Sequence, residues 1–207
     1  MSPRQLAALV VATSFAAGLN VYATVATLGL LARAEIIALP PSLHLLTSWW
    51  VIDASVALYL IEFVADKVPA FDLLWNALQT FVRVPVAALL AYGATQQLSP
   101  GEQVVATALG GVVALIAHGG KTAARVAVTP SPEPFSNIAL SVGEDAVVVF
   151  MMWLAGRHPI WAAAIALAFL VIIVALARVV VRGIRTVFRG AERQLSGSRI
   201  SADTETR

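Results

Sequence analysis

The chain has 207 residues, of which 59% are apolar and only 13% charged, with a formal net charge of +2. A soluble domain carries about 25% charged residues, so this composition argues against a soluble globular protein and predicts an all-α polytopic membrane protein. Cysteine is absent, which excludes disulfides, thiol catalysis and thiolate metal sites. The length allows one bundle of four to six spans and no separate catalytic domain.

Six apolar segments follow one another along the chain, separated by connectors that contain prolines or polar residues. The first segment is interrupted near its middle by the polar stretch GLNVYAT, which contains Asn20 and Tyr22. This interruption predicts either a broken helix or the tip of a re-entrant hairpin. The sequence therefore fits six crossing segments, or four full spans and two hairpins. The expected segments are 6–32, 49–65, 73–94, 103–117, 136–155 and 160–181.

The arginines predict the orientation in the membrane. Six of them crowd the C-terminal end directly after an apolar span, which is typical of a tail at the cytoplasmic membrane surface. An even number of crossings places the N-terminus, with Arg4, on the same side, and the loop at 95–102, which lacks Lys and Arg, on the other. We therefore expect a single transmembrane domain, 1–182, and a basic, partly disordered cytoplasmic tail, 183–207. The arginines are Arg178, Arg182, Arg185, Arg189, Arg193 and Arg199.

The most unusual stretch for a membrane protein runs from His118 to Asp145. Its sequence, HGGKTAARVAVTPSPEPFSNIALSVGED, combines ionisable groups, a glycine pair and three closely spaced prolines. An ionised group at bilayer depth costs at least ~2.5–3.5 kcal/mol on insertion scales, and irregular backbone survives there only against protein or water. The stretch is therefore expected either outside the membrane as a loop or along a polar cavity inside it.

A weak internal repeat relates the two halves of the chain, residues 5–98 and 99–182. AAGLNVYATVA at 16–26 aligns with AHGGKTAARVA at 117–127, and each half then supplies an acidic span with a polar stripe on one helix face. Paired halves with interrupted helices mark the substrate site of many transporters. We therefore expect an inverted repeat; the alternative is chance alignment of small apolar residues. The stripes are Ser55, Tyr59 and Glu62, and Asn137, Ser141 and Glu144.

Carboxylates inside apolar segments are the first candidates for function. An intramembrane acid is a functional candidate by default, because a buried carboxyl group can load and unload protons near neutral pH. The alternative is that Glu144 and Asp145 pair with Arg125 or Lys121 and only hold the fold together, and that Asp66 is an interface residue that ends its span. The predicted proton- or cation-binding residues are Glu62, Asp66, Glu144 and Asp145.

Cations and polar side chains supply the candidates for substrate binding. Lys121 and Arg125 lie one turn apart after a glycine pair, an arrangement that suits a phosphate or carboxylate, unless both are topology charges at the cytoplasmic surface. Arg83, a lone charge in an apolar run, is expected to pair with Glu62 or Glu144. Alternatively, Asn20 and Tyr22 form hydrogen bonds between helices, and Ser136 or Asn137 caps the next helix. The predicted substrate-binding residues are Asn20, Tyr22, Lys121, Arg125, Ser136 and Asn137.

At GLNVYAT, EFVADKVPAFDLLWNALQTFVR and HGGKTAARVAVTPSPEPFSNIALSVGED the chain resembles the bacterial membrane-protein family called domain of unknown function 4126. The resemblance covers about residues 6–181 and implies an architecture and a place in the bacterial inner membrane, not a substrate. A further resemblance to DedA-like proteins implies two re-entrant hairpins, at 13–30 and 105–130, and favours proton-coupled or lipid-directed transport. Asn20 departs from the acidic residue expected at a DedA hairpin tip.

These features favour a small transporter coupled to protons or cations, in which the carboxylates bind the ion and Lys121 and Arg125 contact an anionic solute. The second hypothesis is a lipid translocase or scramblase of DedA type, and the third a non-transporting scaffold that docks a partner through 183–207. An enzyme is least supported, because the sequence has no nucleophile–base pair, metal cluster or cofactor motif. Expected partners are membrane lipids, a small ion or anionic solute and a second protomer, since one short chain encloses little cavity; nucleic acid is not expected.

Overall fold

The computed structural model describes the backbone of residues 2–65, 69–128 and 134–205, and the side chains of residues 2–65, 74–125 and 138–182. Over these residues the chain is helical and contains no strand, which confirms the predicted all-α class. The elements are α1 (Pro3–Leu19), α2 (Val21–Arg33), the 3₁₀ helix η1 (Pro41–Thr47), α3 (Trp49–Ala65), α4 (Pro69–Ala94), α5 (Pro100–Val128), α6 (Pro134–Arg157) and α7 (Pro159–Glu205).

Four helices are long and apolar enough to cross a membrane. A fifth candidate is the pair of η1 and α3, which is bent by 63° at the break between them. Large apolar side chains face outward, such as Phe81 with 80% of its surface exposed, whereas the charged side chains of Glu62, Arg83, Lys121 and Arg125 are buried. This arrangement suits a lipid surrounding, and the chain is a multi-pass membrane protein. The candidate spans are Leu74–Ala94, Pro100–Arg125, Ile138–Arg157 and Pro159–Arg182.

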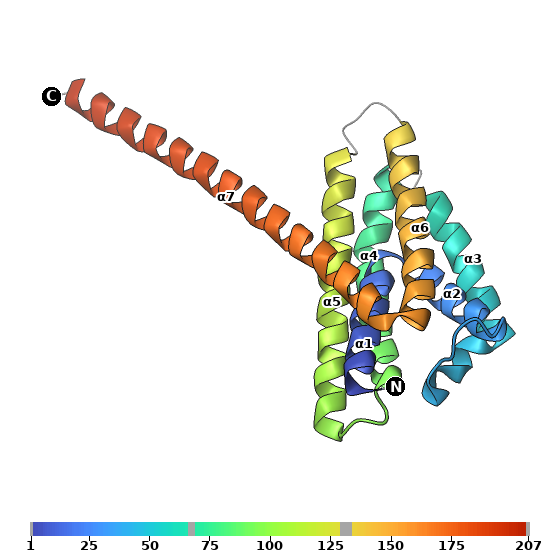
Figure 1. Cartoon of the computed structure of the whole chain (residues 1–207). Coiled ribbons are helices and arrows are strands. Elements are labelled where there is room, and N and C mark those ends of the chain that lie inside the picture. The colour runs from blue at the N-terminus through green and yellow to red at the C-terminus, as the bar shows by residue number, and fades with distance from the viewer. Residues whose placement is uncertain (1, 66–68, 129–133, 206–207) are drawn as a thin grey trace. The chain divides into compact units, whose positions relative to one another are not determined.

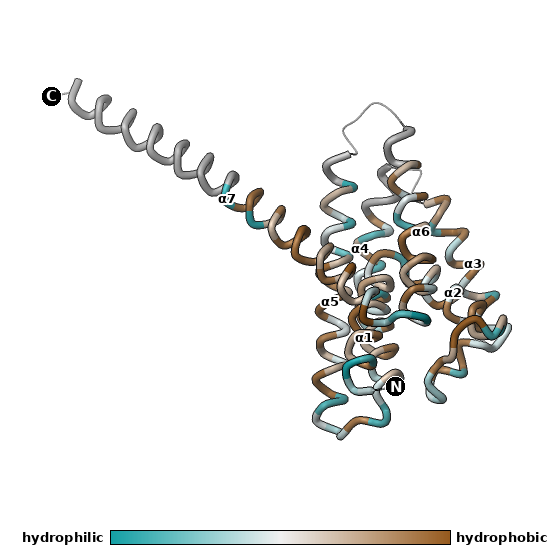
Figure 2. Tube along the Cα trace, viewed as in Figure 1, coloured by the Kyte–Doolittle hydropathy of each residue, from teal (hydrophilic) through white to brown (hydrophobic). Residues whose placement is uncertain are grey.

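The chain divides into two compact units, Met1–Leu170 and Val171–Arg207. Within the first unit, α4 and α5 lie side by side, and α1 packs against both of them and against α6 (Figure 1). α2 packs against α3 and α6. The second unit continues α7 as a helix through the expected basic tail to Glu205. Figure 2 shows that α7 is hydrophobic over most of the part that is coloured by hydropathy.

The interruption predicted in the first segment is a break between α1 and α2 at Asn20. This residue has an extended backbone, with φ −151° and ψ 104°, so the helix cannot continue through it. The Asn20 side chain then caps α2, because its Oδ1 accepts a hydrogen bond from the Ala23 N–H at 3.0 Å. The two helices have 17 and 13 residues, whereas a single spanning helix needs about 20. The first segment is therefore a broken element.

The second hairpin expected from the DedA resemblance, at 105–130, is wrong for the residues that the structure describes there. α5 runs without a break from Pro100 to Val128, so the short segment expected at 103–117 is also longer than predicted. A glycine inside a helix costs only about 1 kcal/mol relative to alanine, which the packing of a long helix readily offsets. The aligned stretches 16–26 and 117–127 thus differ in structure, and the inverted repeat stays a prediction.

Small residues hold α1 against α4 and α5. A Cβ atom added at Gly110 would lie 2.6 Å from the Ala91 Cβ and 2.9 Å from the Ser14 Oγ. A Cβ added at Gly18 would lie 2.5 Å from the carbonyl oxygen of Ala114. Helices in membranes pack closely through such small residues, since lipid offers no hydrophobic drive for their association. This close packing brings the end of α1, where the chain breaks, to the middle of α5.

Candidate functional site

Charged side chains from four helices meet inside the first unit. Glu62 of α3 accepts a hydrogen bond from Arg83 of α4, and Lys121 of α5 lies 3.2 Å from the same carboxylate oxygen. Lys121 also lies 3.2 Å from Oε2 of Glu144 on α6, to which Arg125 donates at 2.9 Å. Glu62, Arg83 and Arg125 are 0% exposed. We call these five residues the ion network; it ties α3, α4, α5 and α6 together.

The break between α1 and α2 contributes backbone groups to the ion network. The last carbonyls of a helix lack partners within the helix and carry partial negative charge. Arg83 donates to the Gly18 carbonyl at 3.4 Å, and Lys121 donates to the Leu19 carbonyl at 3.1 Å. Both cations therefore complement the end of α1. The irregular backbone is buried at a place where charged side chains satisfy it.

His118 holds Arg83 from the side of α5. Its Nδ1 lies 2.8 Å from an Arg83 guanidinium nitrogen, which can only donate, so Nδ1 accepts and the ring proton is on Nε2. That Nε2–H lies 3.0 Å from the Asn76 carbonyl, and the Thr80 hydroxyl lies 2.8 Å from the same nitrogen. His118 is therefore a neutral ring that positions Arg83. Among the described side chains, no three His, Cys, Asp or Glu residues gather as a metal site.

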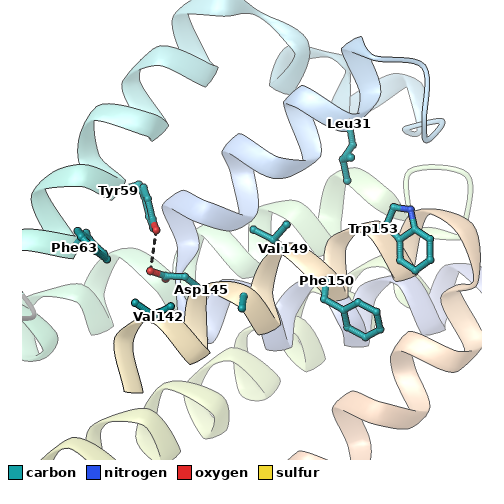
Figure 3. A pocket seen from close by; sticks show the side chains of 9 residues that line it. Leu31, Tyr59, Phe63, Val142, Asp145, Val149, Phe150 and Trp153 are labelled. Atoms are coloured by element: carbon teal, nitrogen blue, oxygen red, sulfur yellow. Dashed lines mark hydrogen bonds between the residues drawn. The ribbon is translucent and has the colours of Figure 1, made fainter. Parts of the chain in front are cut away.

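Asp145 lies beside the ion network and differs from the other two acids. Its Oδ1 accepts from Nδ2 of Asn20 at 3.0 Å. Its Oδ2 accepts from the Tyr59 hydroxyl at 2.9 Å, as Figure 3 shows. Neither donor is charged, so over the described residues Asp145 has no ion-pair partner, whereas Glu62 and Glu144 each have two cations. Asn20 thus joins the cap of α2 to a half-buried carboxylate on α6.

A groove of about 800 Å³ opens beside Asp145. α3 and α6 form its two walls, and α2, which packs against both, adds Leu31. The polar side-chain groups of its lining are the Asp145 carboxylate, the Tyr59 hydroxyl and the Trp153 indole N–H. Figure 3 shows the α6 residues following one another along the helix from Val142 to Trp153. The lining consists of Leu31, Tyr59, Phe63, Val142, Asp145, Ala146, Val149, Phe150 and Trp153.

The structure brings most of the predicted site residues together. Four of them lie in the ion network: Glu62, Glu144, Lys121 and Arg125. There they form ion pairs with one another or with Arg83, which is the structural role that the sequence analysis gave as the alternative to ligand binding. Arg83 pairs with Glu62, one of its two expected partners. From the polar stretch between 118 and 145, the side chains of His118, Lys121 and Arg125 are buried inside the first unit. The described part of the backbone of this stretch is helical, on α5 and α6.

The remaining predicted residues fall into two groups. Asn20 and Tyr22 make hydrogen bonds between helices, the second with Gln79 at 3.1 Å, and neither faces the groove. Asp66 lies outside the described residues, and so do the side chains of Ser136 and Asn137. The ligand roles predicted for all of these positions stay predictions.

Sequence reasoning missed His118 as a partner of Arg83, and it missed the aromatic walls of the groove. The α6 lining residues Val142, Asp145, Val149 and Trp153 recur at spacings of 3, 4 and 4, which places them on one helix face. This signal is visible in the sequence. It carries no function by itself, because apolar residues at helical spacing normally face lipid or a protein core. Only the position of α3 opposite this face shows a groove.

Comparison with known proteins returns one family. The family model described as "Domain of unknown function (DUF4126)" matches residues 7–179. Neither a curated protein nor a solved structure matches the chain. The likeness to DedA proteins is therefore not shown, and it stays a prediction.

Proposed function

The chain belongs to the family of domain of unknown function 4126, and we propose that it is a proton-coupled membrane transporter in which Asp145 binds the proton. The observation that carries this proposal is the contrast among the buried acids. Glu62 and Glu144 are each held by two cations, whereas Asp145 has uncharged partners and faces an open groove. An intramembrane carboxylate without a counter-ion is the group most easily neutralised by a proton.

The hydrogen bonds of Asp145 indicate which oxygen takes the proton. Oδ1 accepts from the Asn20 amide nitrogen, which can only donate, so Oδ1 must remain an acceptor. Oδ2 accepts from the Tyr59 hydroxyl, a group that can both donate and accept. When Oδ2 carries a proton, the Tyr59 hydroxyl can rotate and accept a hydrogen bond from it. Protonation of Asp145 thus reverses the direction of its hydrogen bond with Tyr59 on α3 and keeps its hydrogen bond with Asn20, which caps α2.

Protonation also changes the charge of the cluster. Over the described side chains, the ion network contains two carboxylates and three cations, and Asp145 beside it contributes a third carboxylate. The set is neutral when Asp145 is ionised and carries one excess positive charge when Asp145 is protonated. Because these charges contact the break between α1 and α2, we propose that the change in charge shifts the balance between two arrangements of the break. Coupled transport requires such a shift.

The sequence-based role of Lys121 and Arg125 as ligands of an anionic solute is less well supported. Both cations lie within 3.2 Å of Glu144, and Lys121 is also bound to Glu62 and to the end of α1. An anion would have to displace a buried carboxylate to reach them. We therefore assign these two residues to holding α5 against α6, and Asp145 to the ion.

The test is proton movement in proteoliposomes that contain a pH-sensitive dye. A potassium gradient with valinomycin imposes a membrane potential that drives protons through the wild-type protein. Asp145→Asn is expected to abolish this movement. Asp53→Asn is the matched control, because Asp53 is an exposed carboxylate of α3 that lines no site, and it is expected to behave as the wild type. Proton movement that persists in Asp145→Asn, or is absent from the wild type, would contradict the proposal.

A lipid translocase is the second candidate, and the groove favours it. Val142, Val149 and Phe150 line the groove and are also about half exposed on the apolar outside of the first unit. A lipid chain could follow such a surface without a gradient. Vesicles that carry a fluorescent phospholipid in both leaflets test this directly, because dithionite bleaches only the outer label. A protein that only transports protons leaves the inner label protected, whereas a translocase exposes it.

A further inference from the structure

We propose that the groove beside Asp145 binds an organic cation with an apolar body, such as a quaternary ammonium or phosphonium ion. The inference names a substrate class for the transporter proposed above and rests on that function for its claim of transport. The binding itself follows from the lining of the groove and is tested without any gradient.

The charge of the groove selects a cation. Among the lining residues only Asp145 carries a charge, and an anion would be repelled by it. The neighbouring charges are already paired: Glu62 with Arg83 and Lys121, and Glu144 with Lys121 and Arg125. A small metal cation would find one carboxylate and one hydroxyl where hard ions require several oxygen ligands. The remaining surface is apolar, so the cation that fits is organic.

Aromatic side chains on both walls strengthen this preference. On α3, the rings of Tyr59 and Phe63 lie 6.1 Å apart, and on α6 those of Phe150 and Trp153 lie 6.0 Å apart. The face of an aromatic ring attracts an organic cation, and quaternary ammonium ions are often bound in this way. The volume of about 800 Å³ lies within the range of roughly 300–1,000 Å³ found for small-molecule pockets.

The groove is open at the surface that faces lipid. Val142 and Val149 on one wall are 50% and 49% exposed, and Trp153 is 41% exposed. An amphiphilic cation concentrates at the membrane and can enter from the side without crossing the ion network. Since a proton and the cation would both neutralise Asp145, they exclude each other at this carboxylate.

The experiment is equilibrium binding to the purified protein in detergent, with two probes of the same shape and opposite charge. Tetraphenylphosphonium is expected to bind saturably, and tetraphenylborate is not. Asp145→Asn is expected to weaken tetraphenylphosphonium binding about tenfold or more, because it removes one partner of a close charge pair. Equal binding of the two probes would overturn the proposal, since it would show an apolar surface without charge selection.

A second variant keeps the test independent of the hydrogen bonds of Asp145. Ala146 lines the groove and is exposed, so Ala146→Phe fills the groove and leaves Asn20 and Tyr59 in place. Ala139→Phe is the control, because Ala139 is exposed on α6 two turns earlier and does not line the groove. Tetraphenylphosphonium binding is expected to be lost in the first variant and kept in the second. Binding that survives Ala146→Phe would overturn the assignment of the site.

The remaining outcomes separate this inference from the proposed function. Asp145-dependent proton movement without tetraphenylphosphonium binding would overturn the inference and leave the proton-coupled function standing. Binding without proton movement would support the site and overturn the transport proposal. Binding that is lost when the protein is moved into nanodiscs rich in phosphatidylethanolamine would assign the groove to a lipid with an ammonium headgroup, and would overturn a soluble cation as its ligand.

Discussion

Arg83 is the residue on which the buried polar groups converge. Its guanidinium group reaches Glu62 on α3, His118 on α5 and the Gly18 carbonyl at the end of α1, so one side chain links four helices. A planar guanidinium offers several donors in fixed directions, which a lysine ammonium on a flexible stem does not reproduce. The sequence marked Arg83 as a lone charge in an apolar run, and the structure gives the reason for its presence.

Loss of Arg83 alone is expected to be severely destabilising. Arg83→Leu leaves Glu62 buried beside a single remaining cation, Lys121, and breaking a buried pair costs about 3–5 kcal/mol in free energy of unfolding. The double variant Arg83→Leu with Glu62→Leu removes both charges and is expected to recover most of this loss. Denaturant unfolding followed by circular dichroism measures both effects. A double variant as unstable as the single one would show that the ion pair is not the source of the loss.

The element that positions the site is the broken pair of α1 and α2. Each half supplies one end of a helix to the interior: the carbonyl end of α1 meets Arg83 and Lys121, and the capped start of α2 meets Asp145 through Asn20. Cations at a helix C-terminus and an acid at an N-terminus are the favourable arrangement for the helix dipole. The charged side chains therefore stabilise the break between α1 and α2. In turn, the break positions the groups that bind Arg83, Lys121 and Asp145.

Close packing of α5 against α1 and α4 predicts opposite effects for two adjacent glycines. Gly110→Ala would place its methyl group 2.6 Å from Ala91, which forces the helices apart and is expected to cost about 1–3 kcal/mol in free energy of unfolding. Gly111→Ala meets its nearest neighbour, Val84, at 3.6 Å, so it is expected to be neutral or to stabilise by about 0.4–1 kcal/mol. Thermal unfolding of the two variants side by side provides the measurement; equal shifts would refute this packing argument.

For the whole molecule, the arrangement is that of a membrane protein with a polar interior. In the first unit the acids and bases of the ion network face one another, while large apolar side chains cover the outside. The sequence predicts that both termini lie in the cytoplasm of a bacterium, because the arginines cluster after the last span. This orientation and the inner membrane as location are proposals for this chain.

The absence of cysteine makes the orientation directly measurable. Gln97 is exposed between α4 and α5, and Ser2 is exposed before α1, so each can be replaced singly by cysteine. In intact spheroplasts, a membrane-impermeant maleimide is expected to label Gln97→Cys at once and Ser2→Cys only after permeabilisation. The reverse pattern would invert the topology, and labelling of both in intact cells would exclude a cytoplasmic N-terminus.

The sequence by itself determined the class of the protein, its helical segments and the place where the first segment breaks. These features depend on short stretches: an apolar run long enough to span, or an asparagine that caps one helix and ends another. It also singled out the residues of the ion network as candidates. The same local reasoning made the segment at 103–117 too short, because the pair Gly110-Gly111 is tolerated inside α5 where α4 packs against it.

Only the tertiary structure decided which charges pair, which acid has no counter-ion and where the groove lies. Asn20 and Asp145 are 125 residues apart, and Tyr59 and Asp145 are 86 apart, yet each pair is joined by a hydrogen bond. No local pattern records which helix faces will meet, because that depends on how several helices pack at once. In the sequence, Glu62, Glu144 and Asp145 are all carboxylic acids within apolar segments, and only the structure shows that cations from α4 and α5 reach the first two and not the third.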